Sequence, residues 1–169
     1  MAKLYLLFVC VIGIVLLGGL SGLLSMGMLV PYSGINAQLW YNGLKKLIDV
    51  PTIVFPIVWT ALYILMGFSL WLVLSARRRA DDGNLPRYRA KALELFSFQL
   101  LLNLIWSVIF FGLRLPSVAL LEMIALLAFI VLYIRASHKV NRPAAYLMIP
   151  YVIWVVFAMV LNLTIVMMN

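Results

Sequence analysis

Five long apolar stretches separated by short charged segments limit most strongly what this chain can fold into. A helix needs about 20 mainly apolar residues to cross the roughly 30 Å of hydrocarbon in a bilayer. The pattern therefore predicts an all-α integral membrane protein, a five-transmembrane-helix bundle that forms a single domain over residues 1–169, with a long loop at residues 31–51. The predicted helices cover residues 4–30, 52–76, 92–113, 117–134 and 144–168.

The composition excludes several other classes of protein. The chain is 66% hydrophobic and 11% charged, whereas a soluble domain is about 45–50% apolar and about 25% charged. The net charge of +8 does not indicate nucleic-acid binding, because the basic residues lie in short runs between the apolar stretches. With one cysteine, Cys10, and one histidine, His138, we expect no intrachain disulfide and no metal site.

The distribution of Lys and Arg predicts the orientation in the membrane, since cytoplasmic loops carry an excess of these residues. Five spans place the N-terminus and the loops after the second and fourth spans on one side, with ten Lys and Arg residues. The other side has three, namely Lys45, Lys46 and Arg114. We therefore expect a cytoplasmic N-terminus, a C-terminus on the exported side, and basic clusters that contact the lipid bilayer.

Polar residues inside the third stretch are informative, because an unpaired polar group is costly in hydrocarbon. Gln99, Asn103 and Ser107 recur every four residues and share one helix face. Trp106 and Phe110 flank that face. Two interpretations remain open: hydrogen bonds that hold the helices together, or the polar wall of a ligand cavity.

Two other stretches present an aromatic face at helical spacing. Trp and Tyr often lie at the head-group level of a membrane simply as anchors. Together with the face of Trp106 and Phe110 in the third stretch, these two faces would also form a cavity suited to a flat, largely apolar ligand. The residues of the two faces are Trp59, Tyr63 and Met66 in the second stretch, and Tyr151, Trp154, Ala158 and Leu161 in the fifth.

Single residues at membrane depth give two further predictions. Glu122 is the only carboxylate well inside a predicted span, and we expect a structural ion pair with Arg114 in preference to a proton relay. Gly18 and Gly22 form a GxxxG motif, which permits close helix contact within the chain or in a dimer. No catalytic triad, carboxylate pair, phosphate-binding glycine loop or Cys/His cluster is visible.

Strings of residues in the first loop and in three spans resemble the TspO/MBR family of tryptophan-rich sensory proteins and translocator proteins. The resemblance covers nearly the whole chain, and it depends on the order and spacing of the strings together. The strings are Leu39-Trp40-Tyr41, Val54-Phe55-Pro56-Ile57-Val58-Trp59-Thr60, Leu62-Tyr63, Gln99-Leu100, Leu102-Asn103, Trp106-Ser107, Phe110-Phe111-Gly112, Pro150-Tyr151, Trp154, Phe157-Ala158 and Leu161-Asn162.

The resemblance implies a homodimer whose ligand cavity is closed by the first loop. Family members bind porphyrins such as protoporphyrin IX and haem, and drug-like small molecules. We therefore expect a porphyrin-type tetrapyrrole as ligand, with no required cofactor, no bound metal and no nucleic-acid partner. By motif, Tyr41 would cover the cavity. Together with the helix faces above, the expected ligand-binding residues are Tyr41, Trp59, Tyr63, Gln99, Asn103, Trp106, Phe110, Tyr151, Trp154, Ala158 and Leu161.

The expected function is that of a membrane receptor or carrier with a sensory or transport role. One alternative is a photo-oxidative, porphyrin-degrading enzyme in which Trp59 and Trp154 take part. The other is a small transporter or scaffold without ligand chemistry. The family's Lys-Pro-Ser-Trp run in the first loop is replaced here by Lys46-Leu47-Ile48-Asp49, so we expect a lid of different shape.

Overall fold

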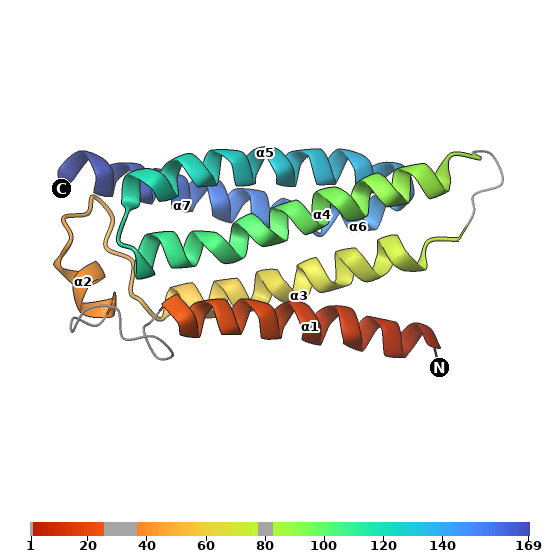
Figure 1. Cartoon of the computed structure of the whole chain (residues 1–169), viewed down its shortest axis with the longest axis horizontal. Helices are drawn as coiled ribbons and strands as arrows, with labels where there is room; N and C mark the ends of the chain where they lie inside the picture. Colours follow the sequence, from red (N-terminus) through yellow and green to blue (C-terminus); the bar gives the residue numbers. More distant parts are fainter. Residues whose placement is uncertain (1, 26–36, 78–82) are drawn as a thin grey trace.

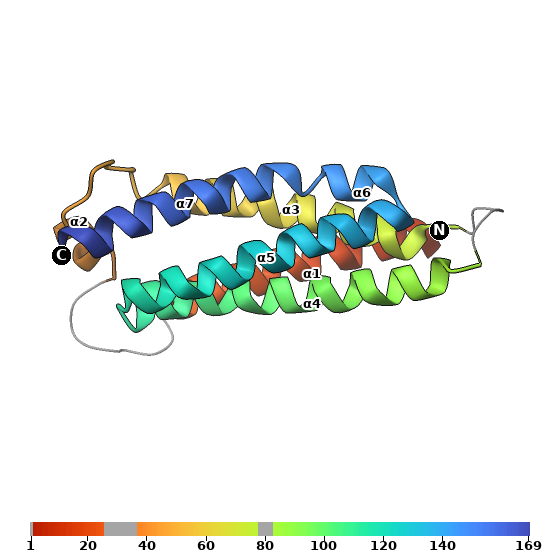
Figure 2. The same cartoon turned by 90° about the horizontal axis from the view of Figure 1, so that it is seen from above.

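Long helices lying side by side form the body of the molecule (Figures 1 and 2). The structure is a computed structural model that describes residues 2–25, 37–77 and 83–169. Within these ranges, five helical segments are long and apolar enough to cross a membrane, and there are no strands. The prediction of an all-α, five-span membrane bundle is therefore confirmed.

In the described residues the five spans are built from seven helical elements, because α4 with η1 forms one span and α6 with α7 forms another, and the short helix α2 lies outside the spans. The bounds are α1 (Ala2–Ser25), α2 (Ala37–Gly43), α3 (Val54–Ser75), α4 (Leu85–Ser107), the π-helical turn η1 (Val108–Gly112), α5 (Pro116–Val140), α6 (Arg142–Tyr146) and α7 (Ile149–Met168). The N-terminus lies at one end of the bundle. The C-terminus and α2 lie at the other (Figure 1).

Several helices extend beyond the apolar stretches seen in the sequence. Helix α4 begins at Leu85, seven residues before the predicted start, and α5 continues to Val140. Pro86 stands in the first turn of α4, where its missing N–H is no loss. Lys and Arg are good helix formers, so the charged segments continue the helices. Hydropathy marks the end of the apolar part of a span and not the end of its helix.

The long loop and the fifth stretch also differ from their predicted form. Residues 31–51 include the short helix α2, while residues 26–36 lie outside the described ranges, as does the predicted end of the first span at residue 30. The fifth stretch is divided into α6 and α7 just before Pro150, which has no N–H to donate to the preceding turn.

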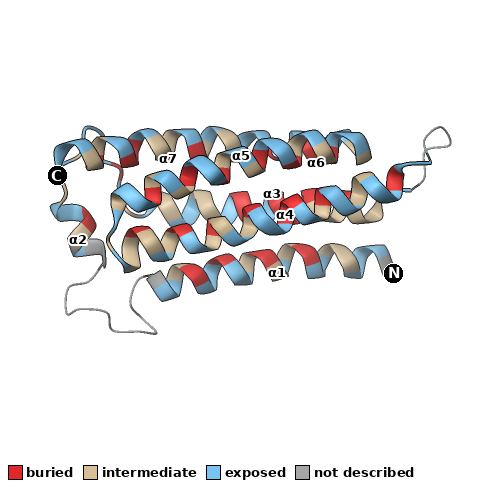
Figure 3. Cartoon of the chain, turned by 45° about the horizontal axis from the view of Figure 1, so that its top comes forward, coloured by how far each residue is buried: buried red, intermediate tan, exposed pale blue. Residues whose placement is uncertain are grey.

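Buried residues follow the inner faces of the helices (Figure 3), and many large apolar side chains are exposed. Helix α4 packs along α5, and α1 packs along α3. Leu121 of α5 and Ile153 of α7 are more than 60% exposed, although both lie within membrane-spanning segments. Such a surface would be unusual in a soluble monomer, whereas lipid tails contact it without cost.

Two glycines allow α1 and α3 to approach closely. A Cβ atom on Gly18 would collide with the ring of Tyr63, and one on Gly67 would lie 2.6 Å from Cα of Val11. A Cβ on Gly22 would meet no described atom within 4 Å. The first glycine of the GxxxG motif therefore serves a contact inside the chain. On the same helix, the Ser21 hydroxyl donates to the carbonyl of Leu104, 2.6 Å away, and joins α1 to α4.

Candidate ligand cavity

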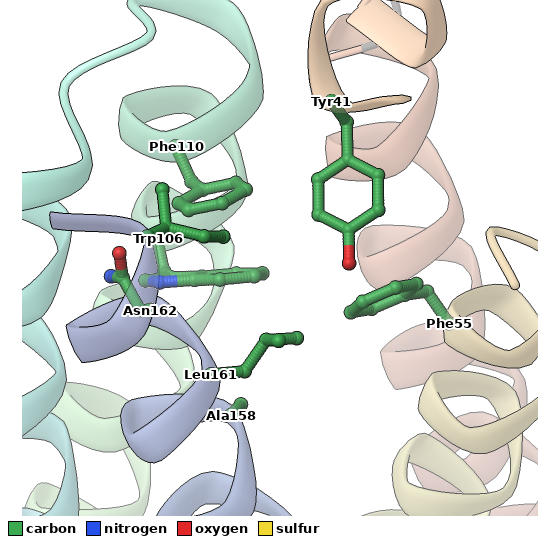
Figure 4. A pocket seen from close by; sticks show the side chains of 8 residues that line it. Tyr41, Phe55, Trp106, Phe110, Ala158, Leu161 and Asn162 are labelled. Carbon is green, nitrogen blue, oxygen red and sulfur yellow. The ribbon is translucent and has the colours of Figure 1, made fainter. Parts of the chain in front are cut away.

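A small cavity lies next to Tyr41 of α2 (Figure 4), the helix at the same end of the bundle as the C-terminus (Figure 1). Its volume is about 10 Å³, which is at the lower limit for a single water molecule. Four structural regions contribute its walls. The lining residues are Tyr41 of α2, Phe55 of α3, Trp106 and Phe110 of α4 and η1, and Ala158, Leu161, Asn162 and Ile165 of α7.

Aromatic contacts hold α2 against the cavity. The Tyr41 side chain is only 1% exposed, and its ring lies 5.6 Å from that of Phe55 in an edge-on arrangement. The neighbouring Trp40 ring lies 5.6 Å from Phe110, also edge-on. Phe110 in turn stacks on Trp106, with ring centroids 5.2 Å apart. Helix α2 therefore packs through Trp40 and Tyr41 over the stacked rings of Trp106 and Phe110, and we call α2 the lid.

The π-helical turn η1 brings two consecutive aromatic residues to the lid. The Leu113 N–H donates to the carbonyl of Val108, 2.8 Å away, which closes the wider turn. The rings of Phe110 and Phe111 lie 6.4 Å and 6.0 Å from that of Tyr41. Successive residues of a regular α-helix diverge by about 100°, so the wider turn helps both rings to face the same partner. Single π-turns often occur at functional sites.

A chain of buried hydrogen bonds joins three helices next to the cavity. The Tyr63 hydroxyl donates to Oδ1 of Asn103, 2.9 Å away, and Nδ2 of Asn103 donates to the Tyr151 hydroxyl, 2.7 Å away. Trp59 stacks on Tyr63, with centroids 5.8 Å apart. These bonds join α3, α4 and α7, which favours the interpretation that Asn103 holds the helices together.

The predicted ligand-binding residues fall into three groups. Five line the cavity, five surround it through contacts with one another or with the lining residues, and Gln99 is fully buried elsewhere in the described core, with neither amide atom hydrogen-bonded. The lining group is Tyr41, Trp106, Phe110, Ala158 and Leu161, and the surrounding group is Trp59, Tyr63, Asn103, Tyr151 and Trp154.

Three lining residues were missed by the sequence reasoning. Phe55 lies one helical turn before Trp59. Asn162 and Ile165 continue the face of Ala158 at i+4 and i+7. Extending each aromatic face by one turn toward the lid would have found all three.

Several polar atoms of the lining residues have no hydrogen-bond partner among the described residues. They are the Tyr41 hydroxyl, the Trp106 indole N–H and Oδ1 of Asn162. Figure 4 shows Tyr41 on one side of the cavity and Asn162 on the other. The Asn162 amide makes only a long contact, 3.8 Å, to the sulfur of Met123. Leaving a buried polar group unpaired costs about 1–3 kcal/mol, so a polar ligand group that reached these atoms would gain by pairing with them.

The lid also carries charged contacts. The ammonium of Lys46 lies 4.0 Å from the ring centre of Tyr41 and donates to the Tyr41 carbonyl at 3.1 Å. It also forms an ion pair with Asp49 at 3.1 Å. Burial raises the pKa of the Tyr41 hydroxyl to about 12, and the nearby Asp49 carboxylate adds to the shift. The hydroxyl is therefore protonated at neutral pH and can donate a hydrogen bond.

The ion pair predicted for Glu122 is not formed in the described part of the chain. Both carboxylate oxygens are buried and accept no hydrogen bond there. Arg114 lies in the bend before α5, with a φ of 57°. The prediction of a Glu122–Arg114 pair was wrong, because placing both residues near one end of two helices does not decide where their side chains point.

A bundle of membrane-spanning helices with an aromatic cavity under a short helical lid defines a class of α-helical integral membrane proteins. The chain belongs to the TspO/MBR family, whose model matches residues 7–168. It is 40% identical to tryptophan-rich protein TspO of Chlorobaculum tepidum over 134 residues, which is 79% of this chain and 81% of the relative.

More distant relatives extend the similarity to archaea and mammals. The chain is 34% identical to tryptophan-rich protein TspO of Archaeoglobus fulgidus over 82% of its own length and 85% of the relative. It is 30% identical to the translocator protein of Bos taurus over 89% of its length and 85% of the relative. The family predicted from the sequence strings is thereby confirmed.

Proposed function

We propose that this protein is a membrane receptor or carrier that binds a porphyrin-type tetrapyrrole, such as protoporphyrin IX or haem, or a drug-like molecule of similar flatness. The ligand would lie beneath α2, between α3, α4 and α7. The observation that carries the proposal is the set of aromatic rings around the cavity, with Tyr41, Phe55 and Trp106 contributed by three different helices. A flat π-surface gains contact area from such walls.

The unpaired polar atoms support a ligand with polar groups at its edges. The Tyr41 hydroxyl and the Trp106 N–H can donate, and Oδ1 of Asn162 can accept. A tetrapyrrole has carboxylates at its periphery that would take donors. No additional cofactor is needed for this role.

Binding requires the lid to move. A cavity of about 10 Å³ is far smaller than the roughly 300–1,000 Å³ of small-molecule sites. The space that a ligand needs would come from a movement of Tyr41 out of the cavity. Tyr41 belongs to the seven-residue helix α2, which can shift more easily than the long membrane-spanning helices that form the other walls. The structure thus corresponds to the closed form of the proposed receptor.

Orientation and assembly follow as parts of the same proposal. The basic residues of α4 and α5, among them Arg87, Arg89, Lys91, Arg135 and Lys139, lie at the end of the bundle opposite the lid. By the positive-inside rule this end faces the cytoplasm. The lid then faces the exported side, and ligand enters from there. The protein acts as a homodimer, as the resemblance to its family implied.

The test is a titration of the purified protein in detergent with protoporphyrin IX, followed by porphyrin absorbance and tryptophan quenching. Saturable binding is expected. Trp106→Ala should weaken it about tenfold, which is about 1.4 kcal/mol, because a stacked wall of the cavity is lost. Trp71→Ala is the matched control, since the Trp71 indole bonds the Lys3 carbonyl at the opposite end of the bundle. Equal losses in both folded variants, or no saturable binding by the wild type, would refute the proposal.

A further inference from the structure

The lid is fastened to the bundle at a point outside the cavity. The backbone N–H of Lys45 donates to Oδ1 of Asn169, 3.0 Å away, and Nδ2 of Asn169 donates back to the Lys45 carbonyl, also 3.0 Å away. The same Nδ2 donates to the Ile165 carbonyl in the last turn of α7, 2.9 Å away. One carboxamide therefore joins the segment after α2 to the helix that forms one wall of the cavity.

Contacts within the lid segment connect this fastening to Tyr41. The Leu44 N–H donates to the Tyr41 carbonyl at 3.3 Å, and the Lys46 ammonium donates to the same carbonyl. The Lys46 side chain is 6% exposed and covers the Tyr41 ring. Residues 41–46 therefore form one compact unit, so a force that holds Lys45 in place also holds the Tyr41 ring over the cavity.

We propose that the Asn169–Lys45 pair is a latch that keeps the lid closed and thereby limits uptake of the ligand. The inference rests on the proposed function and adds a form of regulation to the same site. A latch contact made only in the closed form opposes binding, because apparent affinity falls with the fraction of protein in the competent form. Breaking the latch should therefore speed association and tighten binding.

The first measurement needs no ligand. Amide hydrogen exchange of residues 40–47 is compared between the wild type and Asn169→Ala in detergent. The Lys45 amide should exchange faster in the variant, since its acceptor is gone. The matched control is Thr164→Val, which removes only a bond within α7, from the Thr164 hydroxyl to the Leu161 carbonyl at 2.8 Å. This control should leave exchange in the lid unchanged.

The second measurement is the rate and affinity of protoporphyrin IX binding to the same proteins. Asn169→Ala should bind about fivefold tighter, which is about 1 kcal/mol, because two exposed hydrogen bonds lie at the low end of the usual range. Asn169→Asp keeps the acceptor for the Lys45 N–H and loses the donor to the Lys45 carbonyl, so its affinity for protoporphyrin IX should lie between those of the wild type and Asn169→Ala.

The outcomes separate the latch from the function on which it rests. If Asn169→Ala leaves the Lys45 amide and the binding of protoporphyrin IX as in the wild type, the latch is refuted. Faster exchange with unchanged or weaker porphyrin binding refutes control of uptake. If the wild type binds no porphyrin, the proposed function fails, and the proposal that this latch limits porphyrin uptake fails with it. Faster exchange would still establish the fastening.

Discussion

Replacing Tyr63 by Phe tests whether the buried hydrogen-bond chain holds the bundle together. The change removes one oxygen and leaves the ring that packs between Trp59 and Gly18. The lost bond to Asn103 is 2.9 Å long and buried, so Oδ1 of Asn103 would remain unpaired. An orphaned buried acceptor costs about 1–3 kcal/mol, while interhelical bonds in a membrane average about 0.6 kcal/mol with a maximum near 1.7.

These two ranges overlap between about 1 and 1.7 kcal/mol, and we expect the loss of stability to lie there. For a chain of this size, each kcal/mol lowers the melting temperature by roughly 2–4 °C. Tyr63→Phe should therefore melt about 2–7 °C lower in detergent. Asn103→Leu should cost more, because it leaves both the Tyr63 and the Tyr151 hydroxyls without their partner.

Tyr146→Phe is the matched control, since Tyr146 of α6 is 57% exposed and contacts His138 through its ring, which the substitution keeps. Its melting temperature should equal that of the wild type. The reasoning is refuted if Tyr63→Phe melts with the control. A double-mutant cycle of Tyr63→Phe and Tyr151→Phe should show coupling through Asn103. Additive losses would mean that the two bonds act independently.

Three further predictions concern packing, topology and the lid. Gly18→Ala should lower the melting temperature strongly, because even a Cβ atom there would meet the Tyr63 ring, while a Cβ at Gly22 would meet no described atom within 4 Å and Gly22→Ala should leave the melting temperature unchanged; equal losses would contradict the α1–α3 contact. Reporter fusions after residue 169 and within residues 77–91 should report opposite sides of the membrane, and the same side for both would exclude a five-span topology. Between pH 10 and 12 the free energy of unfolding should fall more in the wild type than in Tyr41→Phe. The reason is that the raised pKa of Tyr41 keeps its hydroxyl neutral in the folded state while the unfolded chain loses the proton, so stability falls as the pH rises. Identical pH profiles would show that this hydroxyl is not buried.

The fold and the positions of most candidate residues followed from periodicity, because span length and aromatic spacing are local properties of a helix. Asn103 and Trp106 are examples, since their helix face could be read directly from the spacing. What could not be predicted is which partner each side chain meets. The Asn103 amide forms hydrogen bonds with Tyr63 and Tyr151. These bonds depend on how three helices are shifted along their axes relative to one another, and the sequence pattern of a single helix does not contain that information.

The start of α4, the helix α2 and the contact between Lys45 and Asn169 could not be predicted, because the local sequence there is ambiguous or too short to show a pattern. Pro86 is a residue type common in turns, but proline also fits the first turn of a helix, which is where Pro86 stands. The lid helix α2 is too short to show a period. The fastening of Lys45 by Asn169 joins residues 124 positions apart, and neither residue has a distinctive neighbourhood in the sequence.

The π-helical turn Val108–Gly112 has a consequence for comparing this chain with its relatives. A π-turn contains one residue more than the α-helical path it replaces, so it corresponds to a single-residue insertion in α4. Deleting one residue there would restore a regular α-helix, in which the side chains after Gly112 keep their direction and those inside the turn change theirs, so that Phe110 and Phe111 would no longer face Tyr41 together. Alignments that place a one-residue gap between Trp106 and Pro116 should therefore be treated as changes in the geometry of the site, and not as neutral variation in loop length.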